Sequence, residues 1–138
     1  MTLSGIHWIA VLVSALVAIA SGAIWFGPRT FYPTWAKALG KSEGEVPGAG
    51  MNMGIVFGAT FLSQFVQATS LALVLTAVKD LNAGKGLLAG FVIGVGIAAA
   101  SSLGHRLFSG HGFKVWALEV GNDVLNLTLM GLIIGAWA

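Results

Sequence analysis

Four polar residues near the C-terminus have the spacing of a single helix face. Glu119, Asn122, Asp123 and Asn126 lie at positions i, i+3, i+4 and i+7, and such positions share one side of an α-helix. Carboxyl and amide groups grouped in this way are suited to bind a small solute or a proton, and a carboxyl group also serves as an acid or a base. This face is the first candidate site.

A second set of polar residues repeats the pattern earlier in the chain. Thr60, Ser63, Gln64 and Gln67 follow the same spacing. Counting residues from the ends of the apolar segments places Gln64 and Gln67 near the depth of Asp123. We therefore expect Asp123 to lie near Gln64 or Gln67, whose amide hydrogens can satisfy a carboxyl group without water, or near a bound molecule.

A basic pair precedes the segment that contains Glu119. His105 and Arg106 are separated from that segment by a short loop, so a helical hairpin brings them level with its first turns. We expect Glu119 to pair with Arg106 or His105, which leaves Asp123 as the freer carboxyl group. The alternative is that these residues form a buried ion pair that only fixes the helix register.

Metal and cofactor chemistry has little support in the sequence. There is no cysteine, and the only histidines are His7, His105 and His111. His105, His111 and Glu119 are suitable ligand types, but their spacing matches no recognised metal motif. We therefore expect no metal and no cofactor, and we assign no catalytic residue.

The composition limits the kind of chain that positions these residues. Of the 138 residues, 57% are hydrophobic and only 9% are charged, whereas an ordinary soluble domain has about 25% charged residues. The mean hydropathy is +0.89. A soluble globule and a nucleic-acid-binding protein are therefore excluded, the latter also because the net charge of +2 includes no basic cluster.

The apolar segments are long enough to cross a membrane. We predict one all-α membrane domain over residues 1–138, a bundle of four transmembrane helices with short connectors. The predicted helices cover about 6–26, 51–78, 86–108 and 114–137. The connector 27–50 holds all three prolines and is expected to include a short interfacial helix that ends at Gly40.

Charges near the helix ends predict the orientation. Arg29, Lys37, Lys41, Arg106 and Lys114 fall on one side, and Lys79 and Lys85 fall on the other. Positive residues favour the cytoplasmic side. We therefore expect the first and third connectors in the cytoplasm and both termini outside.

Small residues recur at every fourth position in all four segments. We predict that Gly54, Gly58, Gly90 and Gly94 lie at contacts between helices, since small residues let helix backbones approach closely in lipid. The same pattern also suits contacts between copies of the chain. The expected partners are therefore the lipid bilayer and, as an open alternative, a second copy in a homo-oligomer, with no nucleic acid.

Several local motifs together resemble a known family. They are Trp25-Phe26-Gly27-Pro28, Phe31, Trp35, Lys37-Ala-Leu-Gly-Lys41, Met51-Asn52-Met53, Glu119-x-x-Asn122 and Gly135-Ala136-Trp137. The chain resembles, over essentially its whole length, the bacterial membrane family catalogued as domain of unknown function 1761. The resemblance implies a four-helix protein of a bacterial plasma membrane, and it carries over no activity and no catalytic residue.

Three functions remain open from the sequence. The first is binding or transport of a small solute, proton or lipophilic molecule at a polar cluster between the helices of segments 51–78 and 114–137. The second is a structural or accessory subunit whose polar residues only lock the bundle. The third is a membrane-embedded enzyme that uses Glu119 or Asp123 as its acid or base.

Overall fold

The computed structural model describes residues 1–41 and 50–138. Within these residues every regular element is helical, which confirms the all-α prediction. The elements in chain order are η1 (Leu3–Gly5), α1 (Trp8–Trp25), α2 (Tyr32–Ala38), α3 (Met53–Leu75), α4 (Ala83–Ile93), the π-helical stretch η2 (Gly94–Ala99), α5 (Ala100–Phe108) and α6 (Gly112–Trp137).

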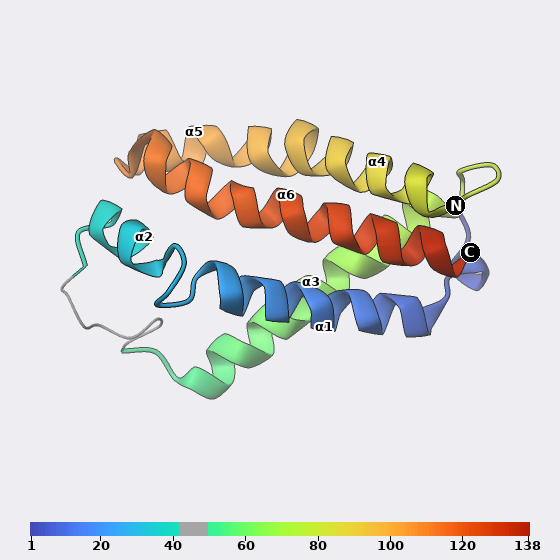
Figure 1. Cartoon of the computed structure of the whole chain (residues 1–138), viewed down its shortest axis with the longest axis horizontal. Coiled ribbons are helices and arrows are strands. Elements are labelled where there is room, and N and C mark those ends of the chain that lie inside the picture. Colours follow the sequence, from blue (N-terminus) through green and yellow to red (C-terminus); the bar gives the residue numbers. More distant parts are fainter. Residues whose placement is uncertain (42–49) are drawn as a thin grey trace.

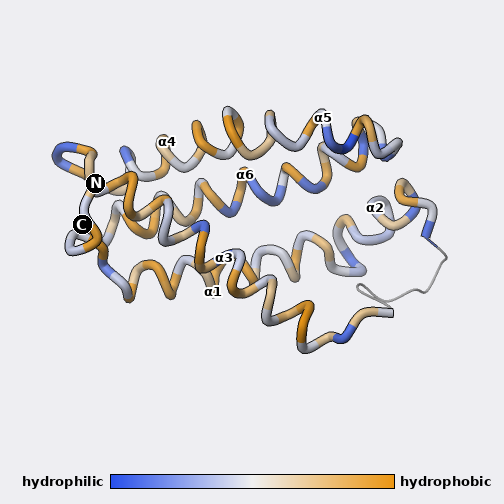
Figure 2. The backbone as a smooth tube through the Cα atoms, turned by 180° about the vertical axis from the view of Figure 1, so that it is seen from behind, coloured by the Kyte–Doolittle hydropathy of each residue, from blue (hydrophilic) through white to orange (hydrophobic). Residues whose placement is uncertain are grey.

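Four of the described helical stretches are long and apolar enough to cross a membrane. They are α1, α3, the continuous stretch Ala83–Phe108 formed by α4, η2 and α5, and α6. The shortest has 18 residues, which at about 1.5 Å per residue nearly matches a hydrocarbon core of about 30 Å. Figure 2 shows mostly hydrophobic positions along these helices, with a group of hydrophilic positions inside α6.

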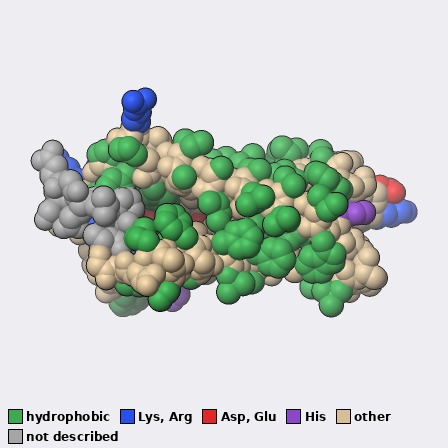
Figure 3. Space-filling model, turned by 90° about the horizontal axis from the view of Figure 1, so that it is seen from below, with side chains coloured by type: hydrophobic (Ala, Val, Ile, Leu, Met, Phe, Trp, Pro, Cys, Tyr) green, Lys and Arg blue, Asp and Glu red, His purple; other side chains and the backbone are tan. Residues whose placement is uncertain are grey.

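The helix α6 lies at the centre of the bundle. It packs against α4 on one side and against α1 and α3 on the other. Both termini lie at one end of the molecule, here called the terminal end (Figure 1). The opposite end, which holds α2 and the loop between α5 and α6, is called the Arg106 end. Figure 3 shows a face dominated by hydrophobic side chains, with the Lys and Arg side chains at the two ends.

Glycines let α4 and α6 approach until their backbones touch. A Cβ atom added to Gly86 would lie 2.0 Å from the Gly131 carbonyl oxygen, and one added to Gly90 would lie 2.1 Å from the Leu127 carbonyl oxygen. At Gly94 the added atom would lie 3.0 Å from Val124 Cα. Because lipid provides no hydrophobic drive between helices, close packing of this kind supplies the attraction instead.

The glycines of α3 behave differently, and the prediction for them is wrong within this chain. A Cβ atom on Gly58 would meet no described atom within 4 Å, and one on Gly54 would meet only Asn52 Oδ1, at 3.1 Å. Asn52 is the N-cap of the same helix and accepts a hydrogen bond from the Ile55 N–H. Neither glycine therefore contacts another helix among the described residues.

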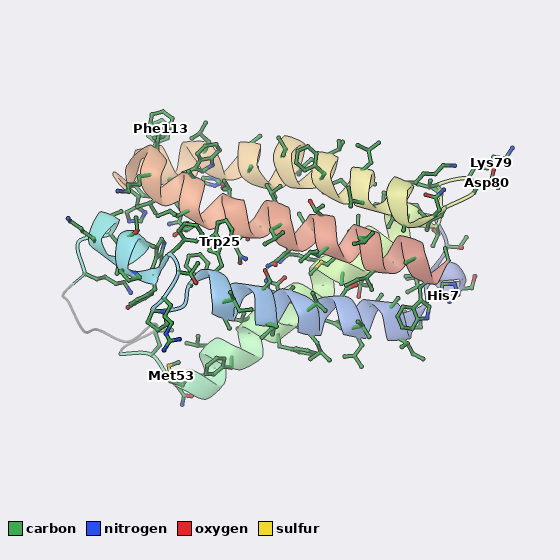
Figure 4. The ribbon with its side chains drawn as sticks, viewed as in Figure 1. His7, Trp25, Met53, Lys79, Asp80 and Phe113 are labelled. Carbon is green, nitrogen blue, oxygen red and sulfur yellow. The ribbon has the colours of Figure 1, made fainter. Side chains whose placement is uncertain are left out.

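Only the C-terminal half of α3 packs into the bundle. Its buried residues are Ala68, Leu71, Ala72 and Leu75. The N-terminal half carries exposed hydrophobic side chains such as Ile55 and Phe57. It diverges from α6 toward the Arg106 end, where Met53 begins the helix away from the rest of the bundle (Figures 1 and 4). Part of α6 at this end is consequently left uncovered by α3.

The first connector contains the short helix α2, in the region where the sequence predicts an interfacial helix. Pro33 stands in its first turn, and Gly40 follows the helix with a φ of +77°, a conformation that glycine adopts without strain. The Trp35 ring packs edge-on against Phe26, with 5.3 Å between the ring centroids. Ring packing therefore holds α2 against the end of α1.

A π-helical stretch interrupts the third span beside α6. The Ala99 carbonyl oxygen at its end accepts a hydrogen bond from Trp116 Nε1 at 2.9 Å. A π-helix shifts the backbone pairing to i+5 and often marks a functional region of a helix. The Trp116 indole of α6 therefore donates a hydrogen bond to a carbonyl group of the π-helical stretch.

Candidate functional site

Glu119 is fully engaged at the Arg106 end. One carboxylate oxygen lies 2.5 Å from Arg106 Nη2 on α5. The other accepts a hydrogen bond from Trp35 Nε1 on α2 at 3.1 Å. Charge-assisted hydrogen bonds of this kind are stronger than neutral ones. The Glu119 carboxylate thus connects α6 with α5 and α2. Of the two partners that the sequence predicted, Arg106 and His105, it pairs with Arg106.

His105 does not belong to this cluster, which corrects the prediction for it. Its side chain is exposed and makes no hydrogen bond or ion pair with any described residue. Consecutive residues point about 100° apart around a helix, so Arg106 and His105 cannot both face α6. The histidine that contacts Arg106 is instead His111 from the loop, whose Nδ1 atom lies 3.1 Å from Arg106 Nη1.

Trp25 fixes the end of α1 on α6. Its Nε1–H donates to the Leu118 carbonyl oxygen at 2.8 Å, and its ring packs on Phe31 with centroids 4.5 Å apart. A Cβ atom added to Gly121 would lie only 2.7 Å from Trp25 Cζ2, so the indole requires glycine there. Figure 4 shows Trp25 reaching from α1 toward α6 beside α2.

The two asparagines of α6 lie inside the bundle, and Asn122 faces α1. Asn122 Nδ2 donates to Ser21 Oγ at 3.2 Å, and Asn126 Nδ2 donates to Asn122 Oδ1 at 3.4 Å. Both asparagines are buried. The partner of this polar face is therefore Ser21 of α1, which the sequence analysis did not include.

The prediction that Gln64 and Gln67 satisfy Asp123 is wrong. Neither glutamine makes a hydrogen bond with Asp123, and Gln67 donates to Ser63 of its own helix at 3.3 Å. Gln67 lines a groove of about 440 Å³ between α3 and the α4–η2 stretch instead, whose other walls include Ile93, Ile97 and Leu127. The divergence of α3 from α6 explains why matching depth did not produce contact.

Three buried side-chain oxygens have no hydrogen-bond partner among the described residues. They are Ser14 Oγ on α1, Gln64 Oε1 on α3 and Asn126 Oδ1 on α6. Ser14 is 0% exposed and Asn126 is 2% exposed. Leaving such a group unpaired costs about 1–3 kcal/mol, so each is available to a bound water molecule or a ligand.

Asp123 makes no hydrogen bond or ion pair with any described residue. It lies about 14 Å along α6 from Lys114, which is near the middle of the span. The charged groups that act on it electrostatically are Glu119, one turn away, and Arg106. Its carboxyl group therefore differs from that of Glu119 in having no partner of its own.

The surroundings of Asp123 follow from the path of α3. Met130 lies seven residues further along α6, so both side chains project from nearly the same face of the helix. Met130 is buried in the core that α3 shares with α1 and α6. Toward the Arg106 end α3 diverges from α6 (Figure 1), and the Asp123 side chain is only partly buried.

These features define a helical membrane protein with a polar cluster inside its membrane-spanning bundle. The chain belongs to the family described as "Protein of unknown function (DUF1761)", whose model matches residues 9–135. The resemblance drawn from the sequence motifs is thereby confirmed. No curated protein and no solved structure gives a significant match to the chain.

Proposed function

We propose that this protein binds a small solute within the bilayer, as the binding step of its transport. The binding cluster consists of Asp123, Asn126 and Asn122 on α6, with Ser14 and Ser21 on α1. The observation that carries the proposal is the unpartnered carboxyl group of Asp123 in the middle of a membrane span. An aspartate at such a depth costs about 2.5–3.5 kcal/mol on insertion scales, and no hydrogen bond or ion pair with a described residue offsets that cost.

A purely structural role accounts for Glu119 but not for Asp123. Glu119 holds α5 and α2 against α6 through Arg106 and Trp35, and such a pair specifies geometry. Asp123 holds nothing within the described chain. We therefore assign a structural role to Glu119 and a solute-binding role to Asp123.

The divergence of α3 supplies a route to Asp123. Toward the Arg106 end α3 diverges from α6 (Figure 1), its N-terminal half has no buried residue, and Asp123 is partly exposed among the described residues. Charged and aromatic side chains stand at this end, including Arg106, Trp35 and Lys41. A water-soluble molecule is expected to reach Asp123 from there.

The positive charges support a cytoplasmic location for the Arg106 end. Five of the seven Lys and Arg residues belong to the connectors or helix ends on that side, and two belong to the terminal end. With the positive-inside tendency, we place both termini on the outer side of a bacterial plasma membrane. The solute then reaches the cluster from the cytoplasm.

Thiol accessibility tests the proposed site, since the natural sequence has no cysteine. The protein carrying Asp123→Cys is reconstituted in phosphatidylcholine vesicles and treated with a small charged methanethiosulfonate reagent. We expect rapid labelling, because the position is reached by water. Val95→Cys is the matched control: Gly94 beside it contacts Val124, so its depth is similar, but Val95 is exposed on the lipid-facing surface.

Two results would overturn the proposed site. The first is an Asp123→Cys thiol that reacts no faster than the Val95→Cys thiol. The second is an Asp123→Cys thiol that reacts only after the bundle is unfolded by detergent. Either result means that no water-soluble molecule reaches this position in the folded protein.

A further inference from the structure

The charges of the cluster leave one carboxyl group without a counter-ion. Of the two acidic side chains in α6, Glu119 is paired with Arg106, and Asp123 is paired with no described residue. The remaining Lys and Arg side chains near this end are engaged or exposed: Lys41 lies over the Trp35 ring, and Arg29, Lys37 and Lys114 are exposed at the surface. The charge missing at Asp123 is therefore positive.

The neutral groups beside Asp123 also lack a donor. Asn126, one turn further along the same face, is almost completely buried, and its Oδ1 atom has no partner among the described residues. Ser14 Oγ of α1 is likewise buried without a partner. The hydrogen bond between Asn122 and Ser21 holds α1 against α6, so Ser14 falls within about one turn of the Asn126 level. A ligand that brings N–H groups suits these oxygens.

Aromatic rings next to Glu119 offer the same preference for positive charge. The Lys41 ammonium group lies 5.2 Å from the centroid of the Trp35 ring, which is the distance of a cation–π contact. Trp35 is in turn bonded to Glu119, one turn from Asp123. The Trp35 ring face is thus filled by the Lys41 ammonium group, so it shows that an ammonium group is accommodated next to Glu119 and is not itself a site for the solute.

We propose that the solute is a small organic ammonium ion, whose charge pairs with Asp123 and whose N–H groups bond to Asn126. This inference rests on the proposed function and names its ligand class. An organic cation is favoured over a divalent metal ion because the described residues contain no group of three His, Cys, Asp or Glu side chains able to hold one.

The test is binding of methylammonium to the purified full chain in phosphatidylcholine nanodiscs, measured by isothermal titration calorimetry. We expect binding to the natural protein and an affinity at least tenfold weaker in Asp123→Asn, which keeps the size and loses the charge. Asp80→Asn is the matched control, since Asp80 is an exposed acid in the α3–α4 loop at the terminal end (Figure 4). This variant is expected to bind as the natural protein does.

A second series identifies the class of ligand. Acetate, glycerol and sodium are titrated under the same conditions, together with Asn126→Leu, which removes the unpartnered oxygen. Methylammonium binding that weakens in both Asp123→Asn and Asn126→Leu supports the inference. Circular dichroism of each variant establishes that it is folded before the titration is interpreted.

The possible failures are distinguishable. If acetate, glycerol or sodium binds in an Asp123-dependent way and methylammonium does not, the ammonium inference is overturned while the proposed binding site stands. If methylammonium binds equally well to Asp123→Asn, the inference is overturned as well. If none of the four binds and the thiol at position 123 is also inaccessible, the proposed function and the inference both fail.

Discussion

Replacing Asp123 and Glu119 with leucine, one at a time, is expected to change the stability of the protein in opposite directions. The two carboxyl groups lie one turn apart on α6 and have the same chemistry. They differ in their partners, since Glu119 bonds to Arg106 and Trp35 and Asp123 bonds to no described residue. Comparing the two substitutions therefore separates the free-energy cost of a carboxyl group within the span from the stabilisation that its contacts provide.

The magnitude follows from the surroundings of each side chain. An aspartate at a span centre costs about 2.5–3.5 kcal/mol. Because Asp123 is only partly buried, replacing it with leucine is expected to remove about half of this cost. We expect Asp123→Leu to stabilise the protein by about 1–2 kcal/mol. Glu119→Leu leaves the Arg106 guanidinium group without its anion. Breaking a buried pair costs about 3–5 kcal/mol, but Arg106 is 36% exposed, so we expect a loss of about 1–3 kcal/mol.

The assay is equilibrium unfolding of the purified protein in mixed micelles with increasing dodecyl sulfate, followed by circular dichroism. Asp80→Asn serves as the control for removal of an exposed acid and is expected to change the free energy of unfolding by less than about 0.5 kcal/mol. A loss of more than about 1 kcal/mol in Asp123→Leu would refute the reasoning, because it would mean that the carboxyl group stabilises the fold.

Three further outcomes are expected. Gly90→Leu disrupts the fold because its first added carbon would meet a backbone oxygen at 2.1 Å. Gly58→Leu leaves the thermal stability of the monomer unchanged. If Gly58→Leu changes the mass measured by light scattering, the Gly58 face of α3 joins two copies of the chain. Trp35→Phe keeps the ring packing but loses the Nε1 hydrogen bond, so stability falls by about 1 kcal/mol and proteolysis of the first connector accelerates. A cysteine at Thr2 reacts with an impermeant maleimide added outside cells and one at Lys41 does not, and the reverse pattern would invert the proposed orientation.

The spans and the polar face of α6 could be predicted because they depend on local periodicity. Apolar length fixes a membrane helix, and a spacing of three and four residues fixes a face. The pairing of Glu119 with Arg106 was also within reach, since only a short loop separates their helices. Predicting that Arg106 rather than His105 pairs with Glu119 would have required the rotation of α5 about its own axis. Hydrophobic periodicity does not give that rotation.

The direction in which α3 runs could not be predicted from the same evidence. Helix periodicity and depth place Gln64 opposite Asp123, but they contain no information on the angle at which two helices cross. The bond between Trp35 and Glu119 joins residues 84 positions apart, and the sequence indicated only that Trp35 lies near an interface. Long-range contacts of this kind depend on packing of the whole bundle.

The divergence of α3 links the fold to the proposed site. The face of α6 that carries Met130 and Ile134 in the terminal half is buried in a core shared with α3. Two turns before Met130 the same face carries Asp123, and a continued apolar contact with α3 there would bury a carboxyl group without a partner. The divergence of the N-terminal half of α3 and the lack of a partner for Asp123 among the described residues are therefore linked, and a cation held by Asp123 would supply a positive charge beside it.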